Sequence, residues 1–235
     1  MVGTALVSGG KDSLYATYLA ECQGWPVDEL VTIRPADPES MMFHTPNLDL
    51  VALQAKAWGK EHRGEASDGG DERSELDAIE RAVRGRPGPV VTGAIASSYQ
   101  WSRLLDVSAR VGRRLYAPLW RVAPGRVVRE EIAAGLDIRL VHLAAEGLSP
   151  DLLGRRLDLP LLDELERRGR PGRGPNVAGE GGEYETLVVD APFFRSRIHL
   201  DDSEVTVAGS TARLDVRRAH LEPKRAPPAT DGGRP

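Results

Sequence analysis

Cysteine is almost absent from this sequence, since Cys22 is the single one in 235 residues. One thiol excludes an intramolecular disulfide framework and any metal site built from several cysteines. Long hydrophobic runs are absent too: nothing approaches the roughly 20 apolar residues that span a bilayer. The start, Met1–Val7, lacks the basic segment and long apolar stretch of a signal peptide. We therefore expect a cytoplasmic protein without a membrane partner.

An excess of basic charge is also missing. The chain has 31 Lys and Arg against 35 Asp and Glu, a net charge of −4. This balance argues against direct nucleic-acid binding through a broad basic face, although a local patch toward an RNA or ribosome-linked partner stays open. The five histidines show no paired metal-ligand spacing, so we expect no zinc site. The length and the hydrophobic fraction of 40% suffice for a real core, in one large domain or two small ones.

The first half of the chain alternates strand-like and helix-like segments. The expected strands are Thr4–Val7, Leu30–Ile33, Pro89–Ile95 and Leu115–Ala117, and the expected helices are Asp12–Gln23, Leu50–His62, Glu72–Val83 and Ser98–Val111. Such alternation implies crossover connections and a parallel sheet. Ligands of these sheets bind beyond the carboxyl ends of the strands, where the strand order reverses. The loops Ser8–Ser13 and Gly93–Gln100 are therefore candidate binding loops.

The second half changes character. We expect helices at Val127–Ala134 and Leu161–Arg168, and strands at Ile138–Leu143, Ile198–Leu200, Val205–Val207 and Leu214–Val216. This pattern predicts a smaller C-terminal α+β domain. The expected division is residues 1–128, residues 129–222, and a disordered tail at 223–235 that is rich in Pro, Gly and charge.

The hexapeptide Ser8-Gly9-Gly10-Lys11-Asp12-Ser13 joins the first strand to the first helix. Two glycines let the backbone N–H groups approach an anion, and the helix N-terminus adds unpaired donors. Both serines offer hydroxyl groups and Lys11 offers a positive charge. A plain glycine turn before a capped helix is the alternative. Asp12 would repel a phosphate unless a metal ion or a neighbouring cation compensates.

Two further segments carry polar groups. Glu180, Glu183 and Glu185 lie within one six-residue stretch of a glycine-rich turn. Carboxylates this close repel one another unless a cation, a proton or an array of hydrogen-bond donors compensates their charge. A solvated acidic turn is the alternative. The segment Gly93–Arg103 follows a strand at the expected switch point. We expect Gly93 to permit close approach of a nucleotide, and its neighbours to offer polar contacts or to cap an amphipathic helix.

The hexapeptide resembles the pyrophosphate loop of the N-type ATP pyrophosphatases, also called the PP-loop superfamily. That resemblance implies a five-stranded parallel sheet with helices on both faces, which is HUP-like or Rossmann-like. It also implies cleavage of ATP between the α- and β-phosphates. ATP as a substrate and Mg²⁺ are the expected cofactors.

The run Gly179–Phe194 resembles the signature of the diphthine–ammonia ligase family. Together the two motifs are much more specific than either alone, and the resemblance covers residues 1 to about 222. Other matching segments are Ala5–Tyr15, Arg34-Pro35, Met42–Thr45, Gly93–Arg103, Pro118–Arg121, Arg129–Ile132 and Leu148–Leu157. The family implies adenylation of the carboxylate of diphthine on translation elongation factor 2. Ammonium then supplies the amide nitrogen of diphthamide, with release of AMP and pyrophosphate.

The resemblance implies roles for individual residues. The catalytic residues would be Lys11, Asp12, Glu183 and Glu185, and Asp12 would also be a Mg²⁺ ligand. ATP and pyrophosphate would be bound by Ser8, Gly9, Gly10, Lys11, Asp12, Ser13 and Gly93. The substrate would be bound by His44, Tyr99, Gln100, Arg103, Glu180, Glu183, Tyr184, Glu185 and Thr186. We further hypothesise that Tyr184, between two glutamates, recognises the trimethylammonium group of diphthine by a cation–π contact.

Two other functions stay open at this point. One is a PP-loop enzyme that modifies tRNA or another acceptor, although the cysteine pairs or basic RNA module that usually support it are absent. The other is a non-catalytic nucleotide-binding regulatory protein, which leaves the glutamate-rich motif unexplained. Diphthamide belongs to archaea and eukaryotes, so a bacterial source would imply a different acceptor. The oligomeric state is open, homo-oligomers included.

Overall fold

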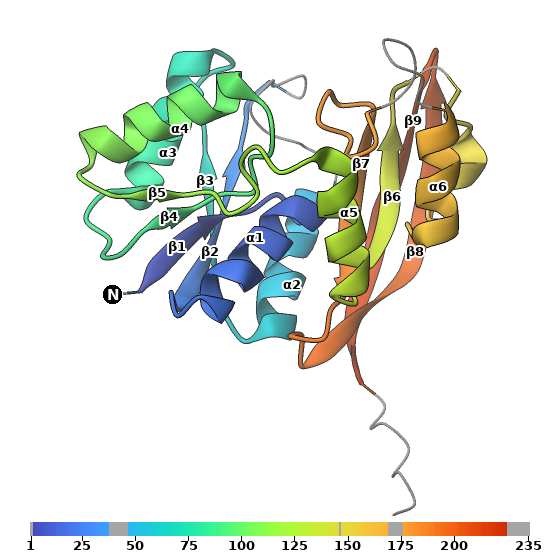
Figure 1. Ribbon diagram of the computed structural model, residues 1–235, viewed down its shortest axis with the longest axis horizontal. Coiled ribbons are helices and arrows are strands. Elements are labelled where there is room, and N and C mark those ends of the chain that lie inside the picture. The colour runs from blue at the N-terminus through green and yellow to red at the C-terminus, as the bar shows by residue number, and fades with distance from the viewer. Residues whose placement is uncertain (1, 38–46, 146, 169–175, 225–235) are drawn as a thin grey trace, which may run out of the picture.

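The structure is a computed structural model that describes residues 2–37, 47–145, 147–168 and 176–224. No helix of this part of the chain is long and apolar enough to cross a membrane. The described chain forms two sheets with helices between and around them (Figure 1).

The N-terminal half builds a five-stranded parallel sheet in the order β3-β2-β1-β4-β5. Its strands are β1 (Gly3–Leu6), β2 (Val27–Arg34), β3 (Glu61–Ala66), β4 (Val90–Val91) and β5 (Leu115–Tyr116). The expected fold class is confirmed. The chain runs outward from β1 to β3 and then returns to β4 on the other side of β1, so the strand order reverses between β1 and β4.

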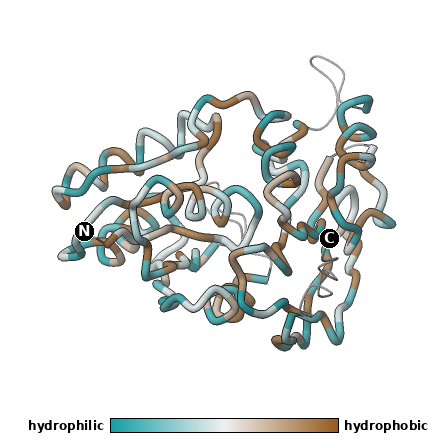
Figure 2. The backbone as a smooth tube through the Cα atoms, turned by 60° about the horizontal axis from the view of Figure 1, so that its bottom comes forward, coloured by the Kyte–Doolittle hydropathy of each residue, from teal (hydrophilic) through white to brown (hydrophobic). Residues whose placement is uncertain are grey.

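Helices cover both faces of this sheet. One face packs against α3 (Glu72–Val83) and α4 (Ser98–Arg110) through residues such as Ile33, Ile79 and Val107. The other face packs against α1 (Lys11–Cys22) and α2 (Val51–Trp58), which follows the short 3-10 helix η1 (Leu48–Leu50). The outer helices α3 and α4 each bury one apolar side, and Figure 2 shows hydrophobic and hydrophilic residues following one another along the backbone.

The expected helix at Leu50–His62 is wrong in its second part. The helix ends at Trp58, because Gly59 adopts the left-handed conformation with φ of 80°. Residues 61–66 then form β3, which pairs with β2 along its whole length. This strand is polar and partly exposed, so its sequence carries no hydrophobic alternation, and the ladder to β2 defines it.

The C-terminal half builds a four-stranded antiparallel sheet in the order β7-β6-β9-β8. Its strands are β6 (Asp137–Leu143), β7 (Tyr184–Asp190), β8 (Ser196–Ala208) and β9 (Thr211–Pro223). The three short strands expected after residue 197 are thus parts of one long hairpin, β8 and β9. Its register closes Ala208 on Thr211 around the turn at Gly209. Two helices, α5 (Pro124–Ala133) and α6 (Leu159–Arg168), and the 3-10 helix η2 (Pro150–Leu152) complete this half.

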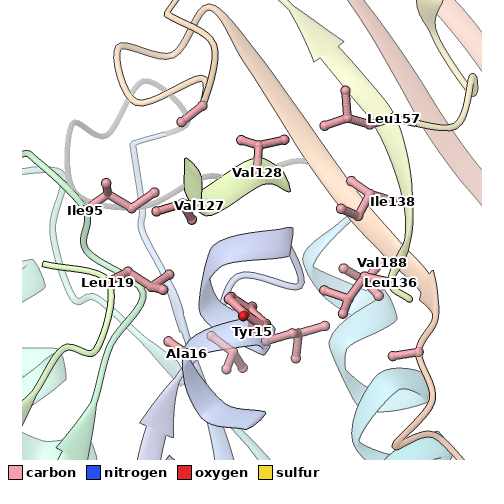
Figure 3. Packing of buried hydrophobic residues seen from close by; sticks show 14 of the residues in the cluster. Tyr15, Ala16, Ile95, Leu119, Val127, Val128, Leu136, Ile138, Leu157 and Val188 are labelled. Atoms are coloured by element: carbon pink, nitrogen blue, oxygen red, sulfur yellow. The ribbon is translucent and has the colours of Figure 1, made fainter. Parts of the chain in front are cut away.

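One hydrophobic cluster joins the two sheets. It contains Tyr15 and Ala16 of α1, Val127 and Val128 of α5, and Val188 of β7 (Figure 3). The division expected between residues 128 and 129 stays a prediction, and both residues lie within α5. Of the expected tail, Pro223 ends β9 and Lys224 pairs with Asp190 at 2.7 Å, so these two residues are ordered. Residues 225–235 lie outside the described residues.

Candidate active site

A pocket lies at the carboxyl ends of β1 and β4, where the strand order reverses, and β7 forms its opposite wall. It brings together the two binding loops and the glutamate-rich motif. Its lining includes Ser8, Gly10, Lys11, Asp12, Ser13, Gly93, Gln100, Glu180, Tyr184, Glu185 and Thr186. Most of the residues expected to act in the site therefore share one pocket, although they come from segments up to 178 positions apart in sequence.

The phosphate loop is held by contacts on both sides. Gly9 adopts φ of +84°, a conformation that side chains rarely take. At Gly10 a Cβ atom would lie 3.2 Å from Thr186 Oγ1, so β7 packs directly against the loop. The same Thr186 hydroxyl accepts a hydrogen bond from the Lys11 backbone N–H at 3.1 Å. β7 thus fixes the first turn of α1.

Lys11 does not point freely into solvent; it is 1% exposed. Its ammonium donates to both carboxylate oxygens of Asp12 at 2.8 Å and to the Ala178 carbonyl at 2.7 Å. Burial alone would lower the pKa of Lys11, but the negative charges of Asp12 and Glu131 outweigh it and raise that pKa. The residue keeps its charge and connects the phosphate loop to the glutamate-rich motif.

Glu131 of α5 is a site residue that the sequence did not reveal. It is 0% exposed, and its carboxyl group interacts with the carboxylate of Asp12. Burial raises its pKa well above the usual range for glutamate, and the charge of Asp12 adds to the rise while Lys11 opposes it. The available signal was an acid on the apolar face of a helix, three and four positions after Val128 and Val127.

Glu131→Gln should change how stability depends on pH. Because the pKa of Glu131 is raised in the folded protein, the folded state keeps a proton that the unfolded chain loses above about pH 4.3. The stabilisation from this proton is complete below that pH and is lost as the pH rises through the folded pKa. Urea unfolding should therefore show wild type losing stability relative to Glu131→Gln between acidic and neutral pH. A difference that does not vary with pH would contradict the raised pKa.

Gly93 lies against the start of α1 as well as at the pocket. A Cβ atom there would lie 2.6 Å from the Ser13 backbone nitrogen and 2.8 Å from the Asp12 carbonyl oxygen. The glycine thus permits close approach of the loop after β4 to the start of α1. Gly93 also lines the pocket, so its expected close approach to a nucleotide stays a prediction, and the backbone packing is a further reason for glycine here.

The three glutamates of the motif point to different places. Glu180 lines the pocket, and its Oε2 accepts from the Ala96 N–H at 2.8 Å, which joins the motif to the loop after β4. Burial raises the pKa of Glu180. Glu183 instead accepts from the backbone N–H groups of Asn176 and Gly181, so it stabilises its own turn. Its expected catalytic role stays a prediction, and its geometry favours a structural one. Glu185 lines the pocket and lies 3.9 Å from the Nδ1 atom of His142.

Tyr184 is enclosed by protein groups. Its side chain is 2% exposed, and its hydroxyl donates to the Val177 carbonyl at 2.5 Å. The Lys11 ammonium already lies 5.8 Å from the centre of its ring. This arrangement argues against the hypothesis that the ring receives the trimethylammonium group of a substrate, because a cation of the protein holds that place.

Two other expected substrate contacts lie outside the pocket. Tyr99 and Arg103 lie on the surface of α4, where Arg103 stacks on the Tyr99 ring at 3.5 Å and both bond to Glu72 of α3. Neither lines the pocket, whereas Gln100 between them does. His44 and the segment Met42–Thr45 lie outside the described residues.

Comparisons with known proteins agree with this architecture. The family model described as "Diphthamide synthase N-terminal domain" matches residues 1–115, and the one described as "Diphthamide synthase C-terminal domain" matches residues 124–221. The chain belongs to the diphthamide synthase family. Relatives named "Diphthine--ammonia ligase" are 32% identical in Homo sapiens, over 94% of this chain and 92% of theirs, and 33% identical in Danio rerio, over 90% and 91%. In Schizosaccharomyces pombe the relative is 31% identical over 90% of this chain and 38% of its own length.

The family confirms the expected class of enzyme, a ligase that forms a C–N bond in diphthamide biosynthesis. A solved structure titled as a predicted subunit of tRNA methyltransferase from Methanocaldococcus jannaschii covers 82% of this chain and 98% of its own. Its TM-score is 0.45 and its sequence identity 15%, a likeness that supports no functional inference.

Proposed function

We propose that this protein is an ATP-dependent diphthine–ammonia ligase acting on translation elongation factor 2. A carboxylate oxygen of diphthine attacks the α-phosphorus of ATP, which releases pyrophosphate and forms an acyl-adenylate. Ammonia then attacks the acyl carbon and the amide C–N bond forms. AMP leaves and carries away the carboxylate oxygen that had attacked the α-phosphorus. Adenylation turns a poor leaving group, hydroxide, into a good one. The family supports ATP use and a protein substrate.

The observation that carries the proposal is the physical union of the two motifs. Lys11 of the phosphate loop bonds to Ala178 and Thr186, on either side of the glutamate-rich turn. Glu180 bonds from that turn to the loop after β4. One pocket therefore contains backbone N–H donors and a helix N-terminus that can bind phosphates. The same pocket contains carboxylates that can bind ammonium and accept a proton from it.

The residues of the pocket fit Mg²⁺ that enters with ATP. Magnesium is usually held by one or two carboxylates together with substrate phosphates and water, so a complete protein cage is not required. The described residues contain no group of three His, Cys, Asp or Glu side chains arranged around a metal. Asp12 lines the pocket, and its carboxylate keeps lone pairs beyond those that Lys11 uses. Asp12 would hold the ion, which would neutralise phosphate charge.

Glu180 is the best candidate base for ammonium. The nucleophile is neutral ammonia, so a proton must leave ammonium before the C–N bond forms. Glu180 lines the pocket, and a carboxyl group with a raised pKa accepts that proton more readily. The backbone N–H of Ala96 holds it in place.

Glu180→Gln should separate the two half-reactions. The amide oxygen can still accept from Ala96, so the loop keeps its position while the base is lost. Amide formation should fall by roughly 100-fold or more. Exchange of labelled pyrophosphate into ATP, which needs only the diphthine-bearing factor and the first step, should stay within about threefold of wild type. Equal loss in both assays would show that Glu180 does not serve as this base.

Transfer of oxygen-18 tests the proposed intermediate. The substrate carboxylate on the factor is labelled, and AMP is analysed after reaction with ammonium. An acyl-adenylate places one labelled oxygen in the phosphate of AMP. Unlabelled AMP would contradict it. A tRNA-modifying enzyme would release AMP only with tRNA present, and a regulatory binder would keep ATP intact.

A further inference from the structure

Gln54 of α2 lies where the helix, the phosphate loop and β7 meet. Its side chain is 0% exposed. The Nε2 atom donates to the Gly9 carbonyl and to the Val188 carbonyl, both at 2.8 Å. The Val188 backbone N–H donates to the same Gly9 carbonyl at 3.1 Å. These three hydrogen bonds form a closed ring that connects the Gly9 carbonyl, the Gln54 side-chain amide and the Val188 backbone.

This ring fixes the orientation of one peptide unit. The carbonyl of Gly9 and the N–H of Gly10 belong to a single planar trans peptide, so they point in opposite directions. Because the carbonyl faces Gln54 and Val188, the Gly10 N–H faces away from them, and Gly10 lines the pocket. A flip of this peptide would turn a carbonyl oxygen toward bound phosphates.

The loop needs such a lock because of its own composition. Two adjacent glycines permit the turn, but glycine populates positive and negative φ with similar ease, so the peptide between them is free to flip. Gly9 has φ of +84°, and a Cβ atom there would lie 2.8 Å from Gln54 Oε1. The glycine that allows the turn also makes room for the side chain that holds it.

We propose that Gln54 is a positioning residue that locks the Gly9–Gly10 peptide in the orientation that binds the phosphates of ATP, a role that rests on the proposed function of the loop as an ATP site. A side-chain amide suits this role because one nitrogen carries two hydrogens for two carbonyl oxygens. Methionine has nearly the same length and no donor. An ionised glutamate would face both carbonyls with negative charge.

The test is titration calorimetry of Mg-ATP into the full-length protein. Gln54→Met should bind ATP roughly 10- to 100-fold more weakly than wild type, as expected for two lost hydrogen bonds. Lys56→Met, on the exposed side of the same helix, is the matched control and should bind as wild type does. Circular dichroism and the unfolding midpoint show which variants are folded. If Gln54→Met does not fold, Gln54→Glu, which has the same size and a polar end, replaces it and should bind at least as weakly.

The outcomes separate this proposal from the proposed function. If wild type fails to bind Mg-ATP, both fail. If wild type binds and a folded Gln54 variant binds equally well, the lock is wrong and the ligase proposal stands. In the complete reaction the KM for ATP should rise while the KM for ammonium stays unchanged. A smaller active fraction with both KM values unchanged would show that Gln54 only supports the fold.

Discussion

Lys11→Met is expected to abolish AMP formation and to lower the free energy of unfolding by about 3–5 kcal/mol. The ammonium is buried and bonds to both oxygens of Asp12 and to the Ala178 carbonyl. Its removal leaves the Asp12 charge without its partner, close to the buried carboxyl of Glu131. The connection between the phosphate loop and the glutamate-rich motif is lost at the same time. Urea unfolding and an AMP-release assay measure the two effects.

Lys60→Met provides the matched control for this experiment. The Lys60 side chain is 7% exposed and its ammonium pairs with Glu21 and the Val27 carbonyl, but it does not line the pocket. This variant should also lose stability, while the folded protein keeps its affinity for ATP. If the folded Lys11→Met variant still formed AMP, Lys11 would not be required for the adenylation step.

Gly93→Ala is expected to lower AMP formation by about 100-fold, because it misplaces the start of α1. The added methyl group would meet backbone atoms of Asp12 and Ser13, which cannot rotate away as a side chain can. Relief requires a shift of the phosphate loop or of the loop after β4. The free energy of unfolding should fall by about 1–3 kcal/mol.

Gly64→Ala is the matched control, since a Cβ atom at Gly64 meets nothing within 4 Å and the residue lies in β3. It should leave activity unchanged and raise stability by about 0.5 kcal/mol, because alanine loses less backbone entropy than glycine. If Gly93→Ala matched this control in both assays, the close packing described around Gly93 would be wrong.

The features that the sequence predicts correctly are those with a local physical signal. Apolar runs such as Thr4–Val7 stop at glycines, and helices such as Glu72–Val83 repeat their apolar residues at helical spacing. Alternation of the two implies the parallel sheet and the place of its ligand. The phosphate loop and most of the glutamate-rich motif accordingly meet in one pocket.

The features that the sequence misses depend on partners distant in the chain. β3 is polar and is defined by its ladder to β2, not by its own pattern. Glu131 and Gln54 are polar residues on buried helix faces. Their roles follow from contacts with residues distant in sequence, Asp12 for Glu131 and Gly9 for Gln54. The Tyr184 ring could in principle bind a substrate cation, but in the folded protein the Lys11 ammonium already lies over it.

The central claim is that this chain joins ammonium to an adenylated carboxylate, and one assay tests it most directly. Purified protein is incubated with Mg-ATP, nitrogen-15 ammonium and elongation factor 2 that carries diphthine, with the unmodified factor in parallel. We expect AMP and labelled amide in equal amounts, only with the diphthine-bearing factor. AMP without amide, or amide formed with release of ADP instead of AMP, would contradict the account.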